Sequence, residues 1–337
     1  MAELRSLRMG SERVNRKGGN CCWYRMVYTL PLPFPIARPH LRHAAAPAFA
    51  AVDDDLRCAI RRSWSGRGRT ATFVVRLARV LDAALQERIH TLWDELAAYE
   101  ASAKDAAVMH LLGVVAGILG AENAYWMGAV RLTSGENDPF CGWRPRLLNY
   151  LRPLPFDKNY TQQRLKSINR GEHDEATVAQ ARAAGTYRAR RLRDLVSPEW
   201  FEGDIYKGYV GQGVHDSLTV TAPVGASTEV YYGFLRMRPG DPFTEAERDV
   251  AYYAMRGLTW FHRQLLLSHG LLVAQSPLSP SERRVLQLLL TDLPEKAIAA
   301  EIGVSPSTLH TYVRDVLRKF GVSGRTGLIA LWLGRRS

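Results

Sequence analysis

The chain has 337 residues, a length typical of about two domains. Hydrophobic residues make up 46% of the sequence and charged residues 23%, which is enough apolar content to form buried cores. With 27 Gly, 17 Pro and only 4 Cys, collagen-like and disulfide-rich scaffolds are excluded. The formal net charge of +12 favours a polyanionic partner, either nucleic acid or an anionic membrane surface.

The excess basic charge is unevenly distributed along the chain. Residues 1–80 hold 15 Lys and Arg against 5 Asp and Glu, a net charge of +10. Residues 81–277 hold 21 against 23, a net charge of −2, and residues 278–337 hold 9 against 5, a net charge of +4. Two basic ends therefore flank a nearly neutral middle region, which indicates three regions with different functions.

The first region, residues 1–72, is rich in Arg, Pro and Ala and shows neither a helical nor a strand period. We predict a mostly disordered tail, and a nucleic-acid-binding arm is the alternative. Its apolar stretch is interrupted by prolines and is not followed by a small-residue cleavage site, so no signal peptide is expected. Few cysteines and no export signal predict a cytoplasmic protein.

Neither a membrane span nor a metal site is expected. The longest apolar run, Ala106–Ala121, contains His110 and is shorter than the roughly 20 residues that a bilayer requires. The four cysteines form no CxxC pair and have no His at ligand spacing, so zinc is not expected. No cofactor is predicted either.

The middle region, residues 73–270, begins with two predicted helices and a strand. Apolar residues three or four positions apart form one face of a long helix: Leu77, Leu81, Leu85, Ile89, Leu92 and Leu96. A second helix is expected from Asp105, taken as its N-cap, to about Gly120. Residues 123–132 then have the composition of a strand.

Later in this region, residues 217–224 and 229–237 are two β-prone runs joined by a short turn, which predicts a hairpin. Thr244 and Glu247 form a capping box that opens a helix. One apolar face runs along that helix as far as Leu265. These elements predict an α+β domain with an antiparallel sheet.

This order of elements, with the hairpin followed by DPFTEAERD, resembles a GAF-type sensory domain over roughly residues 80–268. The resemblance implies a ligand pocket between the sheet and an irregular insert, residues 131–216. The aromatic residues expected to line it are Trp126, Trp143, Tyr150, Trp200, Tyr206 and Tyr209. Each of these could instead fill the core, and the domain could be a dimerisation or protein-docking module without a ligand.

An enzyme in the middle region is a further alternative. Glu172, His173, Asp174 and Glu175 are consecutive and superficially resemble a metal or acid–base site. Consecutive residues cannot all face one centre, and no partner set of defined spacing accompanies them. We therefore expect no catalytic activity.

The last region, residues 278–337, follows a linker at 271–277 and reads as four short helices. Ser279-Pro280 with Glu282 opens the first, and the second runs from Pro294 to Ile302 before Gly303. Ser305-Pro306 opens the third, which runs to Phe320, and a fourth extends over 324–333. The short turn between the second and third helices is typical of a helix-turn-helix.

The third helix, residues 306–320, has two distinct faces at 100° per residue. One is apolar and must be core: Leu309, Val313, Val316, Leu317 and Phe320. The opposite face is polar and basic: Ser307, His310, Thr311, Arg314 and Arg318. It carries no acidic residue, and only Asp315 lies at its margin, which favours docking into a DNA major groove.

The stretch from Leu278 to Thr326 resembles the LuxR (GerE-type) DNA-binding domain of bacterial transcription regulators, through LSPSERRVLQLLL and KAIAAEIGVSPSTLHTYVRDVLRKFGVSGRT. The resemblance implies base reading by His310, Thr311 and Arg314. It implies phosphate contacts by a larger set: Lys296, Ser307, Thr308, Arg318, Lys319 and Arg325.

The sequence thus predicts a bacterial transcription regulator that binds double-stranded DNA as a homodimer. In this family the fourth helix commonly supplies a dimer contact, and Leu328, Leu331 and Trp332 are the candidates here, unless they only cover the module's own core. A ligand in the middle domain is expected to shift the dimer geometry or the exposure of the DNA-reading helix. RNA polymerase is left open as a further partner.

Overall fold

The structure is a computed structural model that describes residues 81–132, 137–155, 159–272 and 278–334. The predicted basic tail, Leu77 at the start of the first helical stripe, and the linker from residue 273 on lie outside these residues. Within them, the chain forms an antiparallel sheet with helices on both faces, followed by a wholly helical region.

The sheet has five strands in the order β2-β1-β5-β4-β3, and every neighbouring pair is antiparallel. The strands are β1 (Asn123–Arg131), β2 (Trp143–Tyr150), β3 (Arg188–Arg191), β4 (Asp216–Pro223) and β5 (Thr228–Arg236). The predicted hairpin is confirmed as β4–β5, in which Val220 pairs with Tyr232. The predicted strand at 123–132 is confirmed as β1, which lies between β2 and β5 in the sheet.

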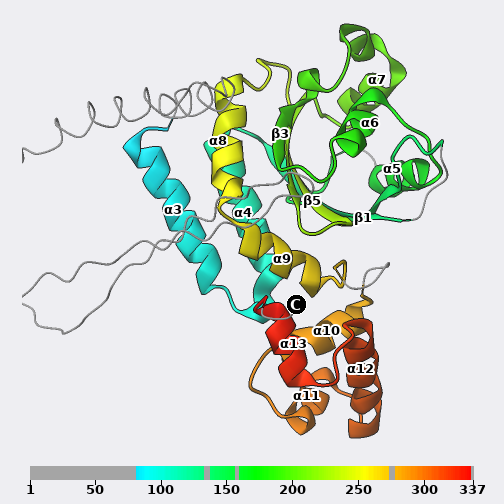
Figure 1. Cartoon of the computed structure of the whole chain (residues 1–337). Coiled ribbons are helices and arrows are strands. Elements are labelled where there is room, and N and C mark those ends of the chain that lie inside the picture. Colours follow the sequence, from blue (N-terminus) through cyan, green and yellow to red (C-terminus); the bar gives the residue numbers. More distant parts are fainter. Residues whose placement is uncertain (1–80, 133–136, 156–158, 273–277, 335–337) are drawn as a thin grey trace, which may run out of the picture. The chain divides into compact units, whose positions relative to one another are not determined.

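Two groups of helices cover the sheet (Figure 1). On one face lie α4 (Lys104–Ile118), α8 (Glu245–Arg256) and α9 (Thr259–Ser268), with α3 (Ala83–Ala98) packed outside them. On the other face lie the shorter helices α5 (Tyr160–Asn169), α6 (Glu175–Arg182) and α7 (Asp204–Gly211). Three 3-10 turns complete this part of the chain: η1 (Ala101–Ala103), η2 (Leu192–Asp194) and η3 (Pro198–Glu202).

The main hydrophobic core lies between the sheet and the first group of helices. Alternate residues of β5, Val230, Tyr232 and Phe234, are fully buried there against α4, α8 and α9. Burial of this apolar surface is the main stabilising contribution to the domain. The core also includes most of α4, whose stretch 101–118 is long and apolar enough to cross a membrane by length and composition alone. Its burial against β1 and α9 makes it a core helix here.

The predicted single helix from Thr244 to Leu265 is wrong, because the chain bends at Gly257 and Leu258 and forms α8 and α9. The indole of Trp93 occupies the space beside Gly257, where a Cβ atom would lie 2.9 Å from the ring. Trp93 also donates its Nε1 hydrogen to the carbonyl of Ala254 at 2.8 Å. The capping box of Thr244 and Glu247 is confirmed at the start of α8.

Two further expectations are corrected. Asp105 is not the N-cap of α4, because η1 precedes the helix and Ala103 occupies the cap position. The insert between β1 and β4 is not irregular, because it supplies both edge strands and the helices α5 to α7.

The C-terminal region contains α10 (Pro280–Leu289), α11 (Glu295–Ile302), α12 (Pro306–Lys319) and α13 (Arg325–Trp332). Ser279 caps α10 in a capping box with Glu282, and Ser305 caps α12 by accepting from the backbone of Thr308. Gly303 ends α11 in the left-handed conformation, with φ of 76°, which a glycine adopts without a steric penalty. These caps are confirmed as predicted, and the helices share one apolar core.

Candidate nucleic-acid interface and ligand cavity

The helix-turn-helix is formed by α11, the turn at Gly303 and α12. The backbone N–H groups of Gly303 and Val304 both donate to the carbonyl of Ala299 at 3.0 Å, which fixes the tight turn. On α12 the buried residues are Leu309, Val313 and Val316, which pack against α10 and α11. The opposite face of the helix is therefore directed to solvent.

This outward face of α12 is exposed along its whole length: Ser307, His310, Thr311, Arg314 and Arg318. Among the described residues, neither His310 nor Arg314 has an ion-pair partner. Arg318 pairs with Asp315 at 3.2 Å, but its side chain remains 74% exposed. The face thus presents hydrogen-bonding and cationic groups that are available to a DNA groove.

The residues predicted to contact phosphate have different environments. Lys296 is exposed in the first turn of α11, and Ser307 and Thr308 lie in the first turn of α12, where both hydroxyls contact Ser305 Oγ at 2.9 Å. Lys319 instead pairs with Glu282 at 2.6 Å.

Arg325 does not support the predicted phosphate contact. Its guanidinium donates to the carbonyls of Leu289 at 2.8 Å and Leu293 at 2.6 Å, and also to that of Thr291. These bonds tie the start of α13 to the loop between α10 and α11. All three nitrogen atoms of the guanidinium are directed at the protein, so the residue has a structural role.

For helix α13 the alternative of a core role is the one observed. Leu328 and Trp332, candidates for either a dimer contact or the module's own core, are buried in that core, and Leu331 is partly buried. The exposed apolar residues here are Ile329 of α13, at 38%, and Leu333, which follows the helix as its C-cap, at 58%. Sequence reasoning missed both, because apolar residues occur on every side of this short helix.

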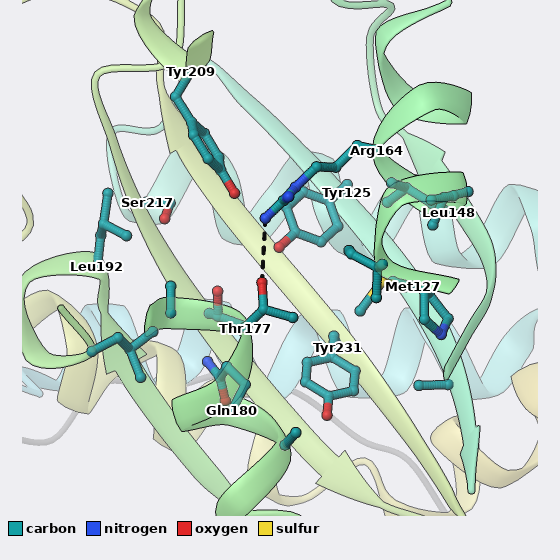
Figure 2. Close-up of a pocket in the computed structure, with 18 of the residues that line it drawn as sticks. Tyr125, Met127, Leu148, Arg164, Thr177, Gln180, Leu192, Tyr209, Ser217 and Tyr231 are labelled. Carbon is teal, nitrogen blue, oxygen red and sulfur yellow. Dashed lines mark hydrogen bonds between the residues drawn. The ribbon is translucent and has the colours of Figure 1, made fainter. Parts of the chain in front are cut away.

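A cavity of about 180 Å³ lies between the sheet and helices α5 to α7. Its wall comes from the strands and from these helices, and it is mainly apolar and aromatic (Figure 2). The lining residues include Tyr125, Met127, Phe140, Trp143, Leu148, Tyr150, Leu165, Ile168, Ala176, Thr177, Gln180, Leu192, Tyr209, Ser217 and Tyr231. A concave, largely apolar site with a few polar groups is the usual form of a small-molecule site.

Three of the six aromatic residues proposed from the sequence line this cavity: Trp143, Tyr150 and Tyr209. Trp126 does not, because successive residues of a strand point to opposite faces, and Trp126 is fully buried in the core on the other side of β1. Trp200 is buried outside the lining. Tyr206 donates to the carbonyl of His215 at 3.0 Å and borders a different, polar hollow.

The polar groups at one side of the cavity pair with one another. The buried carboxylate of Asp174 pairs with Arg164 and accepts hydrogen bonds from the backbone and the hydroxyl of Thr177, at 3.1 and 2.9 Å. Arg164 also donates to Thr177 Oγ1 at 3.4 Å, as Figure 2 shows. This set anchors the start of α6 over the cavity.

A second buried set lies at the other end of α6. Glu229 is fully buried and accepts from both terminal nitrogens of Arg188 at 3.1 Å and from the hydroxyl of Tyr231 at 2.6 Å. Arg188 Nε donates to Gln180 Oε1 at 3.0 Å. Burial chiefly, with Glu229 next, raises the pKa of Tyr231, so this phenol stays protonated at neutral pH.

The acidic run at residues 172–175 does not form a site. Asp174 belongs to the set beside Arg164, Glu172 pairs with Arg170 at 2.7 Å, and Glu175 accepts from the backbone of Ser197. Within the ranges that the structure describes, no group of three or more His, Cys, Asp or Glu side chains could hold a metal ion.

Asp105 connects the middle region to the helix-turn-helix region. Its Oδ1 lies 3.1 Å from His269 Nε2, and its Oδ2 accepts from Arg283 of α10 at 2.6 Å. The hydrogen bond with His269, and next that with Arg283, lowers the pKa of Asp105 to about 2. The carboxylate therefore stays charged at neutral pH.

Residues 276–332 match the family described as "GerE: Bacterial regulatory proteins, luxR family". The C-terminal region is thus a helix-turn-helix DNA-binding domain of the luxR family, as its sequence predicted.

Over 49 residues, 14% of this chain, it is 45% identical to the transcriptional regulatory protein UhpA of Salmonella typhimurium and 43% identical to UhpA of Escherichia coli. The chain spans about a quarter of the length of these relatives.

Solved structures are similar over a longer part of the chain. A crystal structure of Escherichia coli SdiA aligns with a TM-score of 0.36 and 13% identity over 73% of this chain and 95% of that one. SdiA in complex with octanoyl-rac-glycerol gives a TM-score of 0.38 at 13% identity over 76% and 96% of the two chains. The VqsR ligand-binding domain from Pseudomonas aeruginosa gives 0.37 at 13% identity over 55% and 98%.

Proposed function

We propose that the protein is a bacterial transcription regulator that binds promoter DNA through α12. The observation that carries this proposal is the exposed, acid-free face of α12 in a domain that matches the luxR family. Such a helix lies in the major groove, where side chains on its outer face reach the base edges. Because its target is chromosomal DNA, the protein acts in the cytoplasm, and it is not an enzyme.

We assign the two kinds of DNA contact by position. His310, Thr311 and Arg314 read bases, since they lie on the outward face and are exposed. The phosphate contacts lie near the starts of α11 and α12 and at the end of α12, and they are made by Lys296, Ser307, Thr308 and Arg318. These contacts position the domain on the duplex. Lys319 is a weaker candidate because Glu282 already neutralises it.

The middle domain, residues 73–270, is in this proposal a GAF-like sensor that binds a small molecule in the cavity beside the sheet. The support is a largely apolar cavity bordered by two buried polar sets. The second candidate is a dimerisation or docking module without a ligand. A stabilising compound in a thermal-shift screen favours the sensor, because a ligand of the native state raises its stability.

A chain of contacts could carry the signal between the domains. Tyr125 and Met127 line the cavity, and Trp126 between them packs on the other side of β1 with its ring centroid 4.8 Å from that of His269. His269 contacts Asp105, which binds Arg283 of the DNA-binding domain. A displacement of β1 by a ligand would therefore reach α10 through packed groups that touch each other in turn.

The proposed active form is a homodimer that uses Ile329 of α13 and Leu333 at its C-cap, since these are exposed apolar residues. A two-fold dimer would read two half-sites about one helical turn apart. Sedimentation of Ile329→Ser and Leu333→Ser variants tests this contact. A dimer that persists in the double variant excludes it.

The experiment that tests the function is genome-wide mapping of the DNA that the protein occupies in its bacterium. A shared inverted motif upstream of genes, lost in Arg314→Ala, is the expected result. Occupancy without a common motif would exclude sequence-specific regulation.

A further inference from the structure

We propose that the cavity binds an uncharged, planar ring compound that carries a hydrogen-bond acceptor. This inference rests on the proposed sensor function of the middle domain and names the chemical class of its ligand. It follows from the shape of the cavity floor, the balance of charge in the wall and one unsatisfied donor.

The floor of the cavity is an aromatic ring laid across a glycine. Tyr125 of β1 pairs directly with Gly233 of β5. A Cβ atom at Gly233 would lie 2.7 Å from the Tyr125 hydroxyl oxygen and nearer still to two ring carbons, so the ring covers the glycine. Thr219 of β4, which lines the same cavity, lies beside the hydroxyl. The ring is therefore fixed across β5 and presents a flat surface to the cavity, which Tyr231 also lines (Figure 2).

The opposite wall is formed by small residues of α6. Ala176, Thr177 and Ala181 line the cavity from this helix. These side chains are short, so they leave space above the floor, and the two buried polar sets hold the helix at both ends. The flat face of the Tyr125 ring favours a planar molecule, which can stack on it.

The charges in the wall are balanced within the protein. The two arginines that line the cavity, Arg144 and Arg164, pair with Asp138 and Asp174, and Arg144 also lies over the ring of Phe140. A charged ligand would lose its hydration without gaining an unpaired counter-ion, which is costly in an apolar site. The ligand class is therefore uncharged.

Gln180 supplies the polar contact. Its Oε1 accepts from Arg188, which fixes the orientation of the amide, and its Nε2 is buried without a hydrogen-bond partner among the described residues. A buried donor is normally satisfied, and Gln180 lines the cavity. A ligand carbonyl or ring nitrogen placed beside Nε2 would complete its hydrogen bonding.

The test measures binding of three named probes to the full chain by thermal shift and by calorimetric titration at pH 7.5. The probes are 2-naphthamide, which is planar and uncharged, 2-naphthoate, which is planar and anionic, and decanamide, which is uncharged and linear. We expect 2-naphthamide to raise the melting temperature and to bind at least about tenfold more tightly than either of the others, a free-energy difference that one well-placed interaction can supply.

Variants identify the contacts. Gln180→Leu should weaken 2-naphthamide about tenfold and leave 2-methylnaphthalene, which has no acceptor, unchanged. Tyr125→Leu should weaken the binding of both ring compounds, whereas Tyr125→Phe should leave the affinity for 2-methylnaphthalene unchanged. Gln163→Leu, at an exposed position of α5 outside the cavity, is the matched control and should change nothing.

The outcomes separate the ligand class from the function. Tighter binding of decanamide than of 2-naphthamide overturns the ring class and leaves the sensor function standing. Binding of none of the probes, or an unchanged affinity in Gln180→Leu, also overturns this inference. The sensor function fails separately, if Ala176→Phe, which fills the cavity, leaves the regulation of target genes unchanged. The proposed DNA recognition is overturned only by genome-wide mapping that finds no common motif.

Discussion

Tyr232 and His262 form a hydrogen bond of 2.8 Å in the middle of the main core, between β5 and α9. The second ring nitrogen of His262 lies 3.1 Å from the carbonyl of Met255. A carbonyl can only accept, so Nε2 carries the hydrogen and Nδ1 accepts from the Tyr232 hydroxyl. In the neutral imidazole both ring nitrogens thus have a hydrogen-bond partner, and burial of the ring favours this uncharged form.

This neutral histidine predicts a loss of stability in mild acid. Burial lowers the pKa of His262 from 6.5 to about 4 and also lowers that of His269. Below pH 6.5 the unfolded chain binds protons that the folded chain excludes, so the free energy of unfolding falls as the pH decreases. Between pH 7.5 and pH 5, the lowered pKa of His262 alone should reduce the free energy of unfolding by about 2 kcal/mol, measured by urea unfolding.

The variant His262→Gln should lower stability at pH 7.5 and remove most of this pH dependence. His90→Gln, at an exposed position of α3, should leave the dependence intact. Asp105 does not contribute in this range, because its pKa of about 2 and its unfolded value of 3.8 both lie below pH 5. Equal pH dependence in His262→Gln and in the unmodified protein would contradict the assignment.

On the DNA side, Arg314 and Lys296 should behave differently. Arg314→Ala should weaken binding to the operator by about 1–3 kcal/mol and relax the sequence preference, because it removes a base contact. Lys296→Ala should weaken binding to all DNA sequences by a similar factor and reduce the slope of log affinity against log salt by about 1. Both are measured by fluorescence anisotropy across a salt series.

The control for these two variants is Arg284→Ala on α10, where the arginine pairs with Glu301 away from the outward face of α12. It should change neither specificity nor the salt slope by a comparable amount. If Arg314→Ala bound the operator as well as the unmodified protein does, α12 would dock through another face.

The sequence predicted the C-terminal region well because its signals are local. Ser279, Gly303 and Ser305 each determine a helix boundary through contacts within a few residues, and the two faces of α12 follow from helical geometry. The carbonyl contacts of Arg325 could not be predicted, because the carbonyls lie more than 30 residues away along the chain.

The cavity could not be predicted in the same way. Strand β1 is buried on both faces, so its alternation did not indicate which aromatic residues face the cavity, and Trp126 was chosen instead of Tyr125. The run RARR of β3 has the composition of an exposed loop, yet Arg188 is buried because Glu229, 41 residues away, neutralises it. Gln180 gave no sequence signal at all.

The three carbonyl contacts of Arg325 predict a stability role that a lysine cannot fill. Arg325→Lys keeps the charge but loses the fork of donors, so it should lower the free energy of unfolding by about 2 kcal/mol in urea. Arg318→Lys, at an exposed position of α12, should be close to neutral. A loss of DNA affinity in Arg325→Lys without any loss of stability would instead favour a phosphate contact.

The bridge from Asp105 to Arg283 predicts that the two domains unfold as a coupled pair. Asp105→Asn removes the charge while keeping the shape, so Arg283 loses its ion-pair partner and His269 its anionic neighbour. In scanning calorimetry the transition of the DNA-binding domain should separate from that of the middle domain and move down by about 1–4 °C, as expected for one half-exposed pair. Asp315→Asn, which breaks a pair within α12, should leave the separation unchanged. If Asp105→Asn melts with the same profile as the unmodified protein, the bridge does not couple the domains, and the signal must pass through other contacts.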